Sequence, residues 1–215
     1  MNRVTGILCL LILALFVIGT QRRNKVWTDE LALYEDIARK SPEKPQVQAN
    51  LGVAYRNRGL LSKAIAQFEK ADRLHQQRKA WDQVANAKHV GAIALSNIAA
   101  IHLDYGGPAL WGKADQLLEQ ARNTYPPDEF VLANSIEVMI RLGEWERAAN
   151  LLEAAMKEVQ NSAMLNIQGA ELAAVNGRCD IRDAYLHKAE TIDPFIRIDG
   201  GMRVRECKAL ESGGF

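Results

Sequence analysis

Amide side chains recur along this chain at positions where they could bind the backbone of another polypeptide. Each stands beside an apolar position of a helical pattern, and the residues are Asn50, Asn97, Asn134 and Gln168. A side-chain amide carries both donors and an acceptor, so a row of amides can pair with the N–H and C=O groups of an extended peptide. The same amides could instead tie neighbouring helices of the chain together.

Charged and apolar side chains are expected around this row, on the same face of the same helices. The complete predicted peptide-binding set is Asn50, Val53, Arg56, Asn57, Asn97, Phe130, Asn134, Glu137, Arg141, Met164, Gln168 and Glu171. Glu137 and Glu171 are 34 residues apart, so repeated helices would place them side by side, where they could attract a basic segment. Arg141 follows Glu137 by one helical turn and could neutralise it instead. Phe130 and Met164 are the expected apolar anchors.

Other kinds of functional site have no pattern in the sequence. The histidines are His75, His89, His102 and His187, and none has a histidine or cysteine partner at the spacing of a metal site. No glycine-rich phosphate loop and no nucleophile motif is present. The net charge is +1, and no basic stripe carries interleaved aromatic residues. We therefore predict no metal, no cofactor, no nucleic-acid partner and no catalysis; an enzyme with scattered catalytic residues is the alternative.

A period of 34 residues organises the second half of the chain. Alanines recur at this spacing at Ala121, Ala155 and Ala189. Leucines and glycines keep the same spacing, at Leu118, Leu152 and Leu186 and at Gly143 and Gly177. Small residues at regular intervals fit the close crossings of stacked helices, and the glycines fit the ends of the first helix of each pair. The elements that carry the amides are therefore predicted to be repeated helix pairs.

Residues 50–71, NLGVAYRNRGLLSKAIAQFEKA, resemble a tetratricopeptide repeat. The likeness rests on the 34-residue period and on Leu51, Gly52, Tyr55, Gly59, Ala64, Phe68 and Ala71. It implies an all-α solenoid of about four helix pairs over residues 45–194, in which the first helix of each pair lines a concave, peptide-binding surface. The fit is looser at Ser135, Ile136 and Arg182.

Helical segments are also predicted on the flanks of this array and in an insertion. Residues 23–44 match half a repeat and should form a capping helix that begins near Thr28. Residues 77–91 are interpreted as a helical insertion, and residues 195–215 as a C-terminal capping helix and tail. Cys179 and Cys207 could pair at this end in an oxidising compartment, although two free thiols are the simpler interpretation.

An uncharged apolar stretch, VTGILCLLILALFVIGTQ, occupies positions 4–21. At about 1.5 Å per residue, a helix of this length nearly crosses a hydrocarbon layer of about 30 Å. We predict that residues 1–22 form a single transmembrane anchor, with a cleaved signal peptide as the alternative. The basic residues on its two sides lean weakly toward a cytoplasmic C-terminal body.

The segment RRNKVWTDELALYEDIARKSPEKPQVQANLGVAYRNRG is similar to a junction in protein O-mannosyltransferase-like membrane proteins, where tetratricopeptide repeats follow the membrane part. The resemblance covers residues 4 to about 75, lacks the catalytic part, and implies repeats on the periplasmic or lumenal side. We therefore expect a single-pass protein of a bacterial inner membrane whose periplasmic repeats bind another protein or peptide. The alternatives are an accessory or remnant subunit of an envelope glycosyltransferase system, and an adaptor on the cytoplasmic face.

Overall fold

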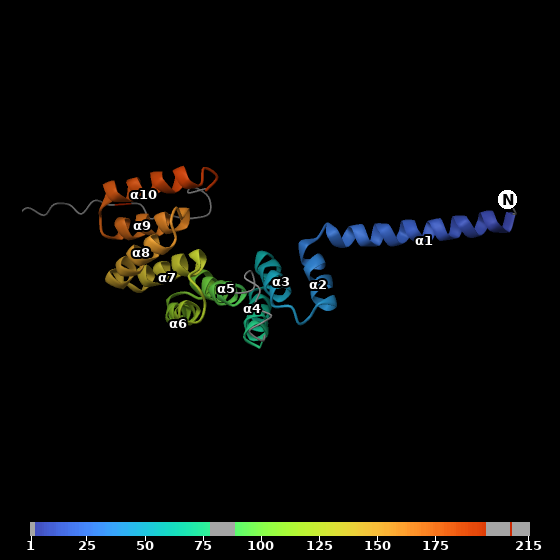
Figure 1. The fold of residues 1–215 in the computed structure, drawn as a ribbon, viewed down its shortest axis with the longest axis horizontal. Helices are drawn as coiled ribbons and strands as arrows, with labels where there is room; N and C mark the ends of the chain where they lie inside the picture. The colour runs from blue at the N-terminus through green and yellow to red at the C-terminus, as the bar shows by residue number, and fades with distance from the viewer. Residues whose placement is uncertain (1–2, 78–88, 197–206, 208–215) are drawn as a thin grey trace, which may run out of the picture. The chain divides into compact units, whose positions relative to one another are not determined.

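The computed structural model describes residues 3–77, 89–196 and 207, and every regular element among them is an α-helix (Figure 1). The prediction of an all-α chain is therefore confirmed for these residues. The chain divides into two compact units, Met1–Leu74 and His75–Phe215. The helix predicted for the insertion at 77–91, and the one predicted after residue 195, fall almost entirely outside the described residues.

The first helix, α1 (Arg3–Trp27), carries the apolar N-terminal stretch. Its large apolar side chains are exposed wherever the structure describes them, for example Leu15 to 69% and Phe16 to 70%. Within the described part of the chain, no helix is both long enough and apolar enough to cross a membrane. The predicted transmembrane anchor is therefore not supported by the structure.

Three more helices belong to the first unit, namely α2 (Glu30–Lys40), α3 (Pro45–Asn57) and most of α4 (Leu61–Gln76). The N-cap of α2 is Asp29, whose carboxylate accepts hydrogen bonds from two backbone N–H groups of the first turn, so the cap predicted at Thr28 is one residue off. Helix α2 packs along α3, and the Tyr55 hydroxyl donates a hydrogen bond of 2.9 Å to Glu35 Oε1. Burial and the Glu35 carboxylate both raise the pKa of Tyr55.

The second unit contains three helix pairs, which follow one another as a stack in Figure 1. They are α5 (Val90–Tyr105) with α6 (Pro108–Thr124), α7 (Glu129–Leu142) with α8 (Trp145–Glu158), and α9 (Ala163–Val175) with α10 (Cys179–Ile192). Helix α7 packs against both α5 and α9, while α6 contacts α5 and α7. The first helices of the pairs therefore form one continuous row.

Small residues fill the crossings between helices, as the repeat pattern predicts. The alanines of the repeat columns are at most 1% exposed, and they are Ala64, Ala71, Ala114, Ala121, Ala148, Ala155 and Ala189. Phe68 and Leu118 are completely buried between them. A Cβ atom added to Gly52 would lie 2.7 Å from Cε1 of Phe68, which is closer than two carbon atoms can approach. The position therefore needs glycine because the next helix crosses directly above it.

The first helix of three pairs ends at a glycine in the left-handed backbone conformation. The φ angles are 71° for Gly59, 79° for Gly143 and 69° for Gly177. Glycine adopts this conformation without the steric cost that a Cβ atom brings. The prediction that these glycines close the first helices is confirmed.

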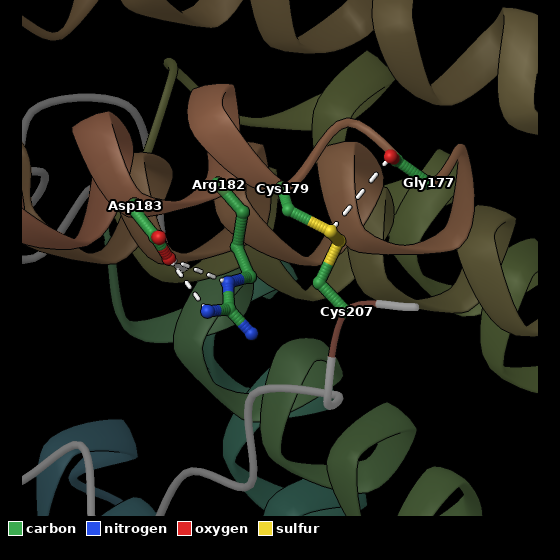
Figure 2. Close-up of a disulfide and its surroundings, with 5 residues drawn as sticks. All are labelled: Gly177, Cys179, Arg182, Asp183 and Cys207. Atoms are coloured by element: carbon green, nitrogen blue, oxygen red, sulfur yellow. Dashed lines mark hydrogen bonds and ion pairs between the residues drawn. A yellow bond between two sulfur atoms is a disulfide. The ribbon is translucent and has the colours of Figure 1, made fainter. Parts of the chain in front are cut away.

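A disulfide joins Cys179, the first residue of α10, to Cys207 (Figure 2). The interpretation of these cysteines as two free thiols is therefore wrong. The bond holds Cys207 beside the last helix-to-helix turn, where Cys179 Sγ lies 3.8 Å from the carbonyl oxygen of Gly177. Arg182, which replaces the usual alanine of the repeat, turns its guanidinium to Asp183, with Nε 2.8 Å from Oδ1. The irregular position is thus accommodated at the surface.

Candidate functional site

The predicted peptide-binding residues lie on the first helices of the pairs, in both units. Asn50, Val53, Arg56 and Asn57 belong to α3 of the first unit. The second unit carries the remainder on α5, α7 and α9, namely Asn97, Phe130, Asn134, Glu137, Arg141, Met164, Gln168 and Glu171. Because these three helices pack in a row, the second unit presents the larger continuous candidate site, called the first-helix face below.

Asn50 and Asn57, among the predicted residues of the first unit, have polar partners within that unit. The Asn50 Oδ1 atom accepts a hydrogen bond of 2.9 Å from Gln46 Nε2, one turn earlier on α3. The Asn57 amide lies 3.5 Å from Glu30 Oε2 on α2. The capping helix α2 therefore occupies part of the polar surface that the sequence assigned to a partner.

Amides on the first-helix face are also engaged within the chain. Asn97 Nδ2 donates to the backbone carbonyl of Ile93 at 2.8 Å, and Asn134 Nδ2 donates to Ser96 Oγ on the neighbouring helix at 2.9 Å. Gln168 is buried, with only 8% of its surface exposed. Of the two hydrogen bonds, the one from Asn134 joins two helices, as the alternative interpretation of the amides expects, whereas the one from Asn97 stays within α5. The amides therefore do not form an exposed row whose donors and acceptors are all open to a peptide.

Glu137 and Arg141 form an ion pair on α7, with Arg141 Nε 3.0 Å from Glu137 Oε1. Arg141 Nη1 also donates to the backbone carbonyl of Leu103 at the end of α5, at 3.0 Å. Its guanidinium carbon lies 5.9 Å from the ring centre of Trp111 on α6. One side chain thus joins three helices and neutralises the carboxylate, so the predicted attraction of a basic segment by Glu137 is weakened.

Phe130 is the most exposed large apolar side chain of the first-helix face, at 55%. It stands in the first turn of α7, where Asp128 Oδ1 accepts hydrogen bonds from the backbone N–H of Phe130 and Val131 at 3.0 and 3.2 Å. This N-cap fixes the start of the helix and therefore the position of the aromatic ring. Met164 occupies the first turn of the next first helix, α9, and is partly buried.

Two residues that the sequence did not single out contact residues of this face. Trp111 supports the Arg141 guanidinium, and Ser96 accepts the hydrogen bond of Asn134. His102 on α5 is 7% exposed, and burial, together with the positive charge of Lys113, lowers its pKa. Trp111 stands 34 residues before Trp145 and could have been found from that spacing, whereas Ser96 and His102 belong to no repeated column.

Among the described residues, no cluster of three or more histidine, cysteine, aspartate or glutamate side chains is arranged to hold a metal ion. What the first-helix face offers is an exposed aromatic ring, a partly buried thioether and polar groups already paired within the chain. Such a surface can take up apolar side chains of another molecule.

The chain matches no protein-family model and no curated protein. It is similar to solved structures of tetratricopeptide-repeat proteins. PilW, a widely conserved type IV pilus biogenesis factor, is 15% identical with a TM-score of 0.60, over 93% of this chain and 82% of PilW. TTC0263, a thermophilic tetratricopeptide-repeat protein of Thermus thermophilus, is 20% identical with a TM-score of 0.59, over 86% of this chain and 90% of that one.

YrrB, described as a tetratricopeptide-repeat protein with an unusual peptide-binding site, is 16% identical with a TM-score of 0.51, over 75% of each chain. At these identities the likeness concerns the fold. None of the comparisons supports a relation to O-mannosyltransferase-like proteins or a membrane segment at the N-terminus. The helix pairs, the buried small residues and the structural neighbours together show that this chain has the tetratricopeptide-repeat fold.

Proposed function

We propose that this chain is a scaffold that binds a protein or peptide partner on the first-helix face of its second unit, and that it performs no catalysis. The observation that carries the proposal is the 55% exposure of Phe130 on a capped helix in the row of first helices. A large side chain held on a rigid helix loses little conformational freedom on binding, so contacts with it convert efficiently into affinity.

The structural neighbours support a binding role. YrrB is described as having a peptide-binding site, and PilW as a factor in the biogenesis of type IV pili. Peptide binding, as described for YrrB, is an interaction with another polypeptide rather than a chemical reaction. By this analogy the partner of the present chain is a peptide segment or a protein surface with large apolar side chains that meet Phe130 and Met164.

A selection from a random peptide library on the purified chain tests this proposal. Enriched peptides should shift the backbone amide resonances of α5, α7 and α9 around Phe130 in NMR spectra. Peptides that shift mainly the resonances of α6, α8 and α10 would contradict the first-helix face as the binding surface. Failure to enrich any peptide would contradict the scaffold function itself.

We also propose that the repeats lie outside the cytoplasm, on the periplasmic side of a bacterial inner membrane. The disulfide between Cys179 and Cys207 supports this location, because such bonds persist in oxidising compartments and are rare in the cytosol. Attachment to the membrane through residues 1–22 is a proposal that rests on the sequence alone.

Thiol trapping tests the location. Cells that produce the full chain are treated with a membrane-permeant alkylating agent, and the purified protein is then reduced and labelled with a second agent. If the repeats mature outside the cytoplasm, Cys179 and Cys207 should carry only the second label. If both carry the first label in freshly trapped cells, the proposed location is wrong.

A further inference from the structure

A cavity of about 240 Å³ lies in the second unit, where the end of α6, the start of α7 and helix α8 meet. Its apolar wall comes from Val131 and Leu132 of α7 and from Leu151 of α8. Ligand pockets for drug-sized molecules measure about 300–1,000 Å³, so this cavity suits one or two apolar side chains rather than a cofactor. None of the residues predicted for the first-helix face lines it.

The charged side chains that line this cavity are two carboxylates and one guanidinium, namely Asp128, Glu158 and Arg122. The charge of Arg122 is already balanced from its own helix. Burial lowers the pKa of Arg122, but the charges of Asp115 and Glu119 on α6 raise it, so both carboxylates favour its charged form. Arg122 therefore does not make the cavity a site for anions.

The other arginine that acts on Arg122 is Arg147 of α8, and carboxylates engage it as well. Its guanidinium pairs with Glu144, and its Nη2 atom lies 3.5 Å from Asp115 Oδ2. Asp115 Oδ1 is still buried without a hydrogen-bond partner among the described residues. The carboxylates that surround the two arginines thus outnumber them, and the two that line the cavity add further negative charge. A cation is the complementary ligand for such a site.

Glu158 is the cavity carboxylate that is open to a ligand. It is the exposed last residue of α8, and the neighbouring Lys157 pairs instead with Glu153, at 2.7 Å. Asp128 is less available, because its Oδ1 atom caps α7 and its Oδ2 atom lies 3.6 Å from His89 Nδ1. A cation at this cavity would therefore pair with Glu158 and would also be attracted by the charge of Asp128.

We propose that this cavity is a second binding site of the scaffold, which takes a peptide segment of a partner protein with a basic side chain beside a large apolar one. The apolar side chain fills the space between Val131, Leu132 and Leu151, and the basic side chain pairs with Glu158. Burial of the apolar side chain supplies most of the affinity, while the charges select lysine or arginine over neutral and acidic residues. The site is separate from the first-helix face, so either proposal can fail without the other.

Three blocked dipeptides test the assignment on the full chain by NMR titration: acetyl-Leu-Lys-amide, its analogue with an acetylated lysine side chain, and acetyl-Leu-Glu-amide. We expect the lysine dipeptide to shift the amide resonances of Leu151, Ala154 and Ala155 on α8. It should bind roughly three- to fivefold more tightly than its acetylated analogue, as expected for a solvent-exposed ion pair. The glutamate dipeptide should bind most weakly. The preference for lysine should shrink in about 1 M salt, which screens exposed charges.

Several results of these titrations would overturn the proposal. They are equal affinities of the lysine dipeptide and its acetylated analogue, tighter binding of the glutamate dipeptide, shifts confined to α5 and α9, and no shift with any of the three. Tighter binding of hexylammonium than of acetyl-Leu-Lys-amide would rule out a peptide as the occupant.

Matched substitutions separate the charge from the cavity. Glu158→Gln should remove most of the preference for lysine, whereas Glu146→Gln, the same change of charge in the first turn of α8, should preserve it. Ala154→Phe places a ring in the cavity and should abolish binding of the dipeptides, while Ala149→Phe, at an exposed position elsewhere on α8, should leave binding unchanged. Circular dichroism should show the same helicity in all four variants. An undiminished preference in Glu158→Gln, or an equal loss in both alanine variants, would contradict the assigned site.

Discussion

At the scale of single residues, the candidate site differs from its sequence prediction because polar groups expected to bind a partner form hydrogen bonds within the chain. The amide of Asn134 bonds to Ser96, and the carboxylate of Glu137 bonds to Arg141. A partner that used these groups would have to replace existing hydrogen bonds, and such an exchange yields little free energy. Affinity must therefore come mainly from the exposed apolar side chains, of which Phe130 is the largest.

Replacing Phe130 with alanine should weaken the binding of a selected peptide by about 1–3 kcal/mol, because it removes the large exposed side chain that we expect to contact the peptide. Isothermal titration calorimetry measures the loss, and circular dichroism should show unchanged helicity. Phe195→Ala, which removes another exposed aromatic ring outside the repeat helices, should leave the affinity unchanged. Equal affinity of the Phe130→Ala variant and the unmodified chain would exclude this anchor.

His102 should make the stability of the second unit depend on pH. Burial lowers the pKa of this histidine in the folded chain, so the unfolded chain takes up the proton first as the pH falls through about 6.5. The free energy of unfolding should therefore decrease between pH 7.5 and pH 5.5, measured by urea titration. His102→Gln should flatten this dependence, whereas His187→Gln, at an exposed position, should preserve it. An unchanged slope in His102→Gln would assign the effect to other groups.

At the scale of the elements, the repeat columns predicted the helices well because they record packing. An alanine such as Ala148 is required where one helix crosses another, and that requirement is visible in the sequence as a period. Gly52 meets the same requirement and was marked by the likeness of its segment to a tetratricopeptide repeat. Side-chain pairing leaves no such trace. The bonds of Asn134 to Ser96 and of Arg141 to Leu103 depend on rotamers and on the register between helices, which a single sequence does not display.

A pair of glycine substitutions tests the packing argument. Gly52→Ala should lower the free energy of unfolding of the first unit by about 1–3 kcal/mol, because its Cβ atom would overlap the buried Phe68 ring. Gly112→Ala, on α6, meets no atom within 4 Å and should raise stability by up to about 1 kcal/mol through helix propensity. Denaturant titrations followed by circular dichroism measure both. A neutral Gly52→Ala variant would show that the crossing is looser than the structure indicates.

At the scale of the whole molecule, the ends of the array differ in how they are secured. In the first unit, α2 packs along α3, and the hydrogen bond between Tyr55 and Glu35 joins the two helices. The last helix, α10, packs against α9 and carries the disulfide to Cys207. The capping role of the α2 segment was visible as half a repeat. The disulfide was not, because two cysteines 28 residues apart are equally compatible with free thiols.

Removing the disulfide should loosen the C-terminal end more than the rest of the array. Cys207→Ser should increase amide hydrogen exchange in α10, while α7 keeps its protection, because neighbouring repeats stabilise one another mainly by local contacts. The loss of global stability should be about 2–4 kcal/mol if the second unit unfolds cooperatively. Cys9→Ser provides the control, since Cys9 lies in α1. Unchanged exchange in α10 would mean that the bond does not secure this end.

Arg141 makes the second unit resist bending between adjacent repeats. Its guanidinium reaches from α7 to the end of α5 and to the Trp111 ring on α6, so it connects the helices of two successive repeats. Contacts of this kind limit how far adjacent repeats can bend relative to each other, because bending would break the hydrogen bond from Arg141 to Leu103. The curvature of the first-helix face is then largely fixed before a partner binds. This favours partners whose shape already matches the face over partners around which the repeats would have to close.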